Sequence, residues 1–118
     1  MGKLNAARQK TFDDFYTGAT IKDAAQIRSA LTDDFTMAGP MMAFDNPDAF
    51  VASLLDIDGK VTQSKLVVDG DDLVHLYVLD VGTEIPMCDV IRFNGDKFAS
   101  MVLYTDSKHF DFDHGAQQ

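Results

Sequence analysis

Hydrophobic residues recur at helical spacing in the first half of the chain, and three helices are expected there. Apolar positions over 4–16 predict an amphipathic helix that ends near Gly18. A second helix is expected over 23–31, because Asp23 is a common N-cap residue and apolar positions follow it at helical spacing. A third helix is expected to begin at 45–48, where a proline suits the first turn.

Alternating apolar and polar residues in the second half of the chain predict strands. We take 61–68 and 73–81 as two strands, although these residues could also divide into three. Two further apolar runs follow, and the last of them ends near Thr105. The pattern therefore favours a meander of four antiparallel strands.

Turn residues separate these strands at regular intervals. Asn94-Gly95 is a strong hairpin signal, because both residues tolerate a positive φ that matches the twist of the flanking strands. Glycine-containing turns are also expected at 69–72 and 81–83. Since the helices precede the meander, the predicted fold class is α+β.

A short strand and an apolar loop connect the second and third predicted helices. The strand is expected over 35–38 and stops at Gly39-Pro40. Residues 41–44, Met-Met-Ala-Phe, follow this turn and are interpreted as a loop. Such a loop suits the rim of a pocket or a contact between two copies of the chain.

Composition points to one folded domain and excludes some partners. The 118 residues suffice for a single core, and we expect one domain over 1–118 with a loose tail from about residue 110. Nineteen acidic against ten basic residues give a net charge of -9, so neither nucleic acid nor an anionic membrane is an expected partner. We find no signal peptide or membrane-spanning run, and the single cysteine, Cys88, is expected to be a buried, unreactive thiol. A reducing cytoplasm is the expected compartment.

Several short segments resemble the NTF2-like superfamily, especially its SnoaL-like and steroid-isomerase-like branch. They are Phe15-Tyr16, residues 30–35 ahead of Pro40, residues 48–50, and 89–95, and the resemblance covers roughly residues 8 to 110. It implies an NTF2-like cone, in which three N-terminal helices pack on a strongly curved, mainly antiparallel sheet around an apolar cavity. It also implies a homodimer through the outer face of the sheet.

The steroid-isomerase-like members use an aspartate base before a proline, a tyrosine in the first helix and an acid on a late strand. In this chain the base position is Gly39 and the tyrosine position is Phe15, and neither side chain can transfer a proton. Tyr16 is adjacent to Phe15, but one helical step turns a side chain by about 100°. Only Asp89 matches, so ketosteroid isomerase activity is disfavoured.

Asp89 is the main candidate for chemistry. Alternation places it on the same strand face as Met87, Ile91 and Phe93, where burial would raise its pKa and favour a protonated acid that binds a ligand carbonyl. Alternatively, the carboxylate is structural and is held by a buried hydroxyl, an amide or Arg92. By the same alternation, Arg92 points to the opposite face.

The face that His75 occupies depends on the length of the loop at 81–83. A three-residue loop would place His75 opposite Asp89 as an acid-base partner, and a two-residue loop would place it on the outer face beside Tyr77. Of the two, the outer face is our expectation.

No cofactor or metal is expected. The sequence contains no phosphate-binding glycine loop, no Gly-x-Ser-x-Gly elbow and no Cys-His constellation. His109 and His114 lie near Asp111 and Asp113, but nothing in this pattern fixes the geometry of a metal site.

A small apolar molecule is the expected ligand, with Asp89 as its polar anchor. The residues expected to contact it have apolar side chains, which could equally be core filler: Phe12, Phe15, Met37, Met41, Met42, Phe44, Leu54, Met87, Ile91, Met101 and Leu103. The alternative is an isomerase, cyclase or hydratase in which Asp89 is the acid or base and His75 or Tyr16 assists. A third possibility is an interacting dimer whose cavity is filled by its own side chains.

Overall fold

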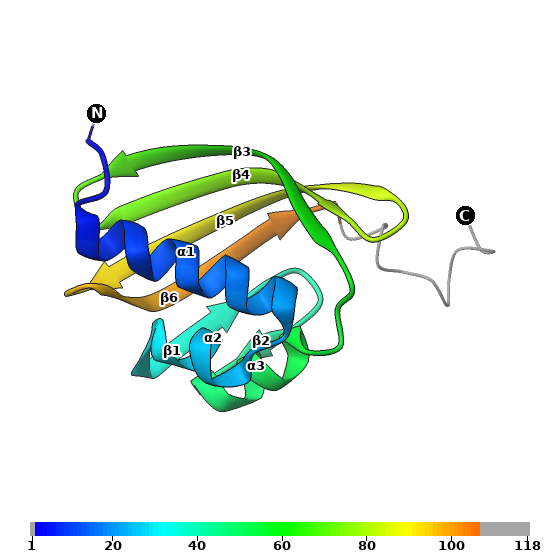
Figure 1. Ribbon diagram of the computed structural model, residues 1–118, viewed down its shortest axis with the longest axis horizontal. Coiled ribbons are helices and arrows are strands. Elements are labelled where there is room, and N and C mark those ends of the chain that lie inside the picture. Colours follow the sequence, from blue (N-terminus) through cyan, green and yellow to red (C-terminus); the bar gives the residue numbers. More distant parts are fainter. Residues whose placement is uncertain (1, 107–118) are drawn as a thin grey trace.

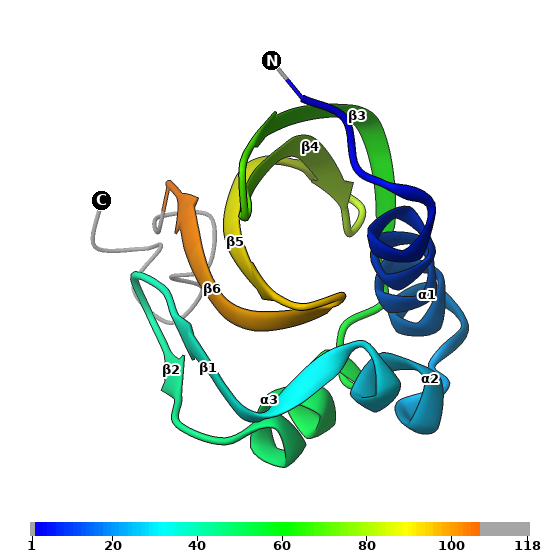
Figure 2. The same cartoon turned by 90° about the vertical axis from the view of Figure 1, so that its left-hand side faces the viewer.

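Residues 2–106 are described by a computed structural model, in which a sheet curls around one long helix (Figures 1 and 2). The helices are α1 (Ala6–Ile21), α2 (Ala24–Ser29) and α3 (Pro47–Leu54). The strands are β1 (Leu31–Ala38), β2 (Ala43–Phe44), β3 (Lys60–Asp69), β4 (Asp72–Asp80), β5 (Glu84–Asn94) and β6 (Lys97–Thr105). Residues predicted as a loose tail, with His109, Asp111, Asp113 and His114, lie outside the described part of the chain.

The sheet has the strand order β2-β1-β6-β5-β4-β3. Its last four strands form the predicted antiparallel meander, joined by turns that contain Gly70, Gly82 and Gly95 at positive φ. β1 pairs in parallel with β6, and the short β2 extends the sheet from β1, so the sheet is mixed. Its two ends do not meet, which leaves a curved, open layer (Figure 2).

β1 begins at Leu31, earlier than the strand predicted over 35–38, and the prediction that the second helix extends to residue 31 is wrong. Ala30 is the C-cap of α2, and Leu31 is paired with Phe98 of β6. Leu31 and Phe35 are completely buried. Pairing with a strand more than sixty residues away thus overrides the local helical spacing. The predicted loop at 41–44 also differs, because Ala43 and Phe44 form β2.

The helix starts follow the local sequence closely. Asn5, Asp23 and Asn46 are the N-caps, and each side chain accepts a hydrogen bond from a backbone N–H of the first turn.

α1 continues past Gly18, where it was predicted to end, and ends at Ile21. A Cβ at Gly18 would lie 3.0 Å from Ile27, so the glycine allows α2 to pack closely against α1.

The family resemblance implied that all three helices precede the sheet. Only α1 and α2 do so, because α3 follows β1 and β2. α1 lies in the open side of the curve, and α3 packs against β1 (Figure 2). Aromatic rings fill the space between them. Phe50 of α3 stacks on Phe35 of β1 and on Phe15 of α1, and Phe15 also contacts Phe98 of β6. Within residues 2–106, no helix is long and apolar enough to cross a membrane.

Candidate functional site

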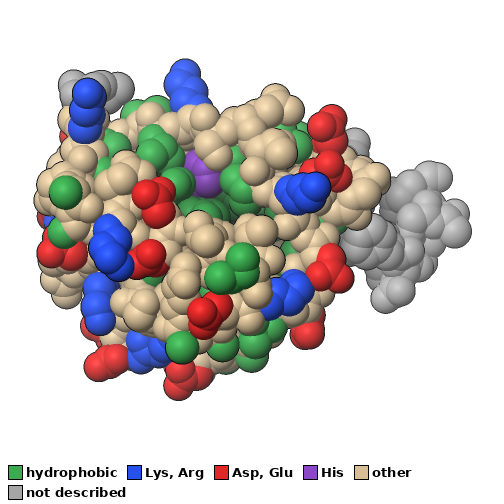
Figure 3. Space-filling view, in the orientation of Figure 1, with side chains coloured by type: hydrophobic (Ala, Val, Ile, Leu, Met, Phe, Trp, Pro, Cys, Tyr) green, Lys and Arg blue, Asp and Glu red, His purple; other side chains and the backbone are tan. Residues whose placement is uncertain are grey.

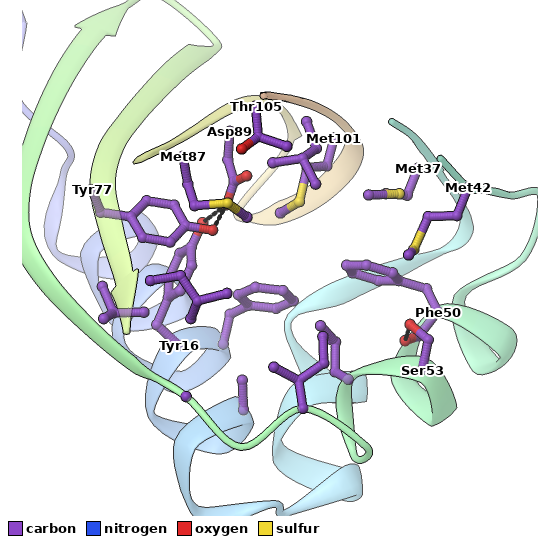
Figure 4. Close-up of a pocket in the computed structure, with 18 of the residues that line it drawn as sticks. Tyr16, Met37, Met42, Phe50, Ser53, Tyr77, Met87, Asp89, Met101 and Thr105 are labelled. Carbon is purple, nitrogen blue, oxygen red and sulfur yellow. Dashed lines mark hydrogen bonds between the residues drawn. The ribbon is translucent and has the colours of Figure 1, made fainter. Parts of the chain in front are cut away.

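A cavity of about 130 Å³ lies inside the curl of the sheet (Figure 4). Side chains from α1, β1, α3 and β3–β6 form its walls, and nearly all of them are apolar. Met41 and Met42 lie at its edge and are 47% and 44% exposed. Asp89 is the one charged side chain among the described residues that line it.

Eight of the eleven residues predicted from the sequence to contact a ligand line this cavity: Phe15, Met37, Met41, Met42, Leu54, Met87, Met101 and Leu103. The other three belong to the hydrophobic core. Phe12 packs edge-on against His75, Phe44 packs against Phe50, and Ile91 is completely buried. Whether the eight contact a ligand stays a prediction.

Two tyrosine hydroxyls converge on Asp89. Tyr16 of α1 and Tyr77 of β4 both donate to the Oδ2 atom of this carboxylate, at 2.7 and 2.8 Å (Figure 4). The other oxygen, Oδ1, makes no hydrogen bond to any residue in 2–106. Asp89 is therefore held in place through one oxygen, while the second remains available.

Burial dominates the protonation of Asp89. The side chain is 3% exposed, and desolvation raises its pKa from 3.8 to about 6, although the two tyrosine hydrogen bonds act in the opposite direction. The carboxyl group therefore titrates close to neutral pH. The pKa values of Tyr16 and Tyr77 are raised by burial and by the neighbouring carboxylate, so both hydroxyls keep their protons.

Arg92 does not hold Asp89. It points to the outer face, as predicted, and pairs with Asp72 at 3.0 Å. Cys88 also points outward, which leaves it only partly buried and contradicts the expectation of a fully buried thiol. Burial raises the pKa of this thiol.

His75 lies on the inner face of the sheet, and the expectation that it lies on the outer face is wrong. The loop at 81–83 has three residues, since Asp80 pairs with Glu84, and this register makes His75 the direct partner of Asp89. The imidazole nevertheless makes no hydrogen bond to Asp89. Its Nε2 lies 3.0 Å from Ser64 Oγ, and its Nδ1 has no partner in the described part of the chain.

The His75 ring is packed among other aromatic rings and does not line the cavity. It stacks on Tyr77 at 4.2 Å between centroids and meets Phe12 and Tyr16 edge-on. Burial lowers its pKa to about 4, so it is neutral at pH 7. His75 thus supports the two tyrosines from behind.

Tyr16 reaches Asp89 although helical rotation turns it away from the direction of Phe15. Both side chains border the cavity, because the sheet curls around α1 and meets it over a wide arc (Figure 2). Tyr77 is the main residue that sequence reasoning missed. Tyr77 lies two residues after His75 and therefore shares its face of β4. A predicted loop of three residues at 81–83 would have placed both side chains on the same face as Asp89.

Neither a family model nor a curated protein matches this sequence. Solved structures do match. An NTF2-like protein of unknown function from Cytophaga hutchinsonii superimposes with a TM-score of 0.81 at 16% identity, over 92% of this chain and 98% of that one. A candidate polyketide cyclase from Xanthomonas campestris gives 0.76 at 11% identity, over 88% and 93% of the two chains.

A candidate ketosteroid isomerase from Kribbella flavida is also similar, with a TM-score of 0.75 at 10% identity, over 85% of this chain and 78% of that one. At such low identity the likeness concerns the fold, and it transfers no activity. The protein has the NTF2-like fold, as the resemblance in its sequence indicated.

Proposed function

We propose that the protein binds a small apolar molecule in this cavity, with Asp89 as the polar anchor. The observation that carries the proposal is the unbonded Oδ1 atom of a buried carboxylate among apolar side chains. Burying a charge is costly unless it is well paired, so a packed core gains nothing from an aspartate here. A ligand that bonds Oδ1 would supply the missing partner.

The size of the cavity limits the ligand. Its volume of about 130 Å³ is close to that of engineered apolar cavities of about 150 Å³, which bind benzene. A single ring or a short aliphatic chain therefore fits inside it. Five methionines in the walls allow some adjustment to shape: Met37, Met41, Met42, Met87 and Met101.

The second candidate function is acid or base catalysis in the same cavity by an isomerase, cyclase or hydratase. The observation in its favour is the pKa of Asp89, about 6, which suits proton transfer near neutral pH, together with the Tyr16 hydroxyl at 2.7 Å. His75 is not proposed as an assisting residue, since it lies behind the tyrosines. Ketosteroid isomerisation stays disfavoured, because no second carboxylate lines the cavity within residues 2–106.

Methionine methyl resonances provide a direct test of binding. With ¹³C-methyl methionine in the protein, cyclohexanol should shift the signals of Met87 and Met101, which line the cavity on either side of Asp89 (Figure 4). Ala19→Phe should abolish these shifts by filling the cavity, whereas Ala52→Phe, on the exposed face of α3, should not. Unchanged methionine signals in the unsubstituted protein would refute the proposal.

The catalytic alternative has its own readout. An Asp89 base would exchange the α-protons of cyclohexanone for deuterium in D₂O, and this exchange would vanish in Asp89→Asn. If cyclohexanone binds but its α-protons do not exchange, the result would favour the binding function alone.

We also propose a homodimer through the outer face of the sheet. Leu76 and Tyr104 are 39% and 60% exposed there, and Cys88 lies between them as the cross-strand partner of both.

The surface charge does not favour a nucleic-acid or anionic membrane partner. On the face in Figure 3, Lys and Arg are dispersed among acidic side chains, and the net charge of the chain is -9.

A further inference from the structure

Within residues 2–106, every side-chain hydroxyl that lines the cavity already donates its proton. Tyr16 and Tyr77 donate to Asp89. The other three donate to backbone carbonyls: Thr20 to Tyr16 at 3.0 Å, Ser53 to Phe50 at 2.7 Å, and Thr105 to Pro86 at 2.7 Å. Carboxylate and carbonyl oxygens carry no proton, so the direction of each of these hydrogen bonds is fixed.

Among the described residues, the polar end of the cavity therefore offers only acceptors. These are Oδ1 of Asp89 and the remaining lone pairs of the oxygens of Tyr16, Tyr77 and Thr105. No lysine, arginine, histidine, asparagine or glutamine lines the cavity in the part of the chain that the structure describes. The backbone N–H groups beside Asp89 lie within α1, β4 and β5, whose own hydrogen bonds engage them.

We infer that the ligand of this cavity presents a hydrogen-bond donor, a hydroxyl or an amine, to Oδ1 of Asp89, and that a simple ketone is not its ligand. The inference rests on the proposed function and names its ligand class. It also replaces the expectation from the sequence that Asp89 binds a ligand carbonyl.

A ketone binds poorly because it finds no free donor. To gain one, its oxygen would have to take a tyrosine hydroxyl from an ionised carboxylate. Hydrogen bonds to ionised groups are roughly twice as strong as those between neutral groups, so the exchange is unfavourable. An alcohol or an ammonium group instead adds a donor where Oδ1 has none.

Protonation of Asp89 reverses this preference. Oδ2 already accepts two hydroxyls, so the proton binds Oδ1 and makes it a donor that faces the cavity. The groups around it do not titrate in the same range. Tyr16 of α1 and Tyr77 of β4 stay protonated, His75 of β4 stays neutral above about pH 4, and β6 contributes Leu103 and the Thr105 hydroxyl.

Three six-membered rings of matched size test the inference: cyclohexanol, cyclohexylamine and cyclohexanone. Their dissociation constants follow from titrations of the methionine methyl signals. At pH 8 the alcohol and the ammonium should bind roughly tenfold more tightly than the ketone, since the ketone leaves a buried acceptor without a partner. At pH 5 Asp89 is mostly protonated, so cyclohexylamine should weaken roughly tenfold and the ketone should gain at least as much.

Asp89→Asn provides the matched variant. Its side-chain oxygen can accept both tyrosine hydroxyls while its NH₂ group faces the cavity as a permanent donor. The variant should bind cyclohexanone at both pH values and should lose cyclohexylamine. The pH dependence of the unsubstituted protein tests the same point without relying on the stability of the variant.

The outcomes separate the two proposals. If cyclohexanone and cyclohexanol have the same dissociation constant at pH 8, the donor requirement is overturned and the proposal of apolar binding is left intact. No methionine shift with any of the three rings would overturn the proposed function and the ligand class together.

Discussion

His75 and Asp89 are direct partners across β4 and β5, and burial shifts their pKa values in opposite directions, to about 4 and about 6. Between pH 4 and pH 6 the folded chain therefore holds an extra proton at Asp89 and lacks one at His75, relative to the unfolded chain. By linkage, the Asp89 contribution to stability falls as the pH rises through this range, and the His75 contribution rises. The two effects oppose each other.

Removing one partner should expose the effect of the other. In Asp89→Asn, the free energy of unfolding should rise between pH 4 and pH 6 by about 2 kcal/mol more than in the unsubstituted protein. In His75→Phe, the free energy of unfolding should fall over the same range by about 2 kcal/mol relative to that protein. Urea denaturation at pH 4, 5 and 6 measures both, and three parallel profiles would show that the two groups do not titrate as described.

The tyrosine hydroxyls should tune Asp89 individually. Tyr16→Phe and Tyr77→Phe each remove a hydrogen bond that lowers the pKa of the carboxyl group, so each should move that pKa above 6. Each should also cost about 1.5–3 kcal/mol of stability at pH 8, where the carboxylate is charged. The ¹³C signal of the Asp89 carboxyl group reports the pKa, and Tyr104→Phe, at an exposed hydroxyl, should leave it unchanged.

Gly59 lies against two side chains at the end of the β4–β5 hairpin. A Cβ there would lie 2.8 Å from Leu79 Cδ1 and 2.9 Å from Val81 Cγ1, so in Gly59→Ala these side chains must turn or shift. Overpacking that side chains relieve in this way should cost about 1 kcal/mol, at the lower end of the usual range. Thermal unfolding should show this loss for Gly59→Ala and little change for Gly39→Ala, whose Cβ has no neighbour closer than 3.4 Å.

The dimer proposal predicts a specific response to a surface charge. Leu76→Asp, on the outer face of β4, should halve the mass measured by light scattering, because it places a charge in the apolar centre of the interface. Ile21→Asp, at the end of α1, changes a residue of 59% exposure and should leave the mass unchanged. A monomeric unsubstituted protein would rule out the interface.

Local sequence signals predicted much of the framework. Asp23 and the Asn46-Pro47 pair mark two helix starts, and Asn94-Gly95 forms the turn between β5 and β6. Alternation also placed Asp89 on the buried face with Met87 and Ile91. These features depend on neighbouring residues alone, through capping, turn conformation and the two-residue period of a strand.

Pairing between distant segments decided the rest. The start of β1 at Leu31 depends on β6, and the inner position of His75 and Tyr77 depends on a loop of three residues at 81–83. A strand pattern shows which side chains share a face, but a shift of one residue in register exchanges the faces. The sequence by itself therefore determined that Asp89 is buried. Only the tertiary structure brought two tyrosine hydroxyls to one of its oxygens and left the other without a partner: the register of β4 against β5 placed Tyr77, and the curvature of the sheet around α1 placed Tyr16.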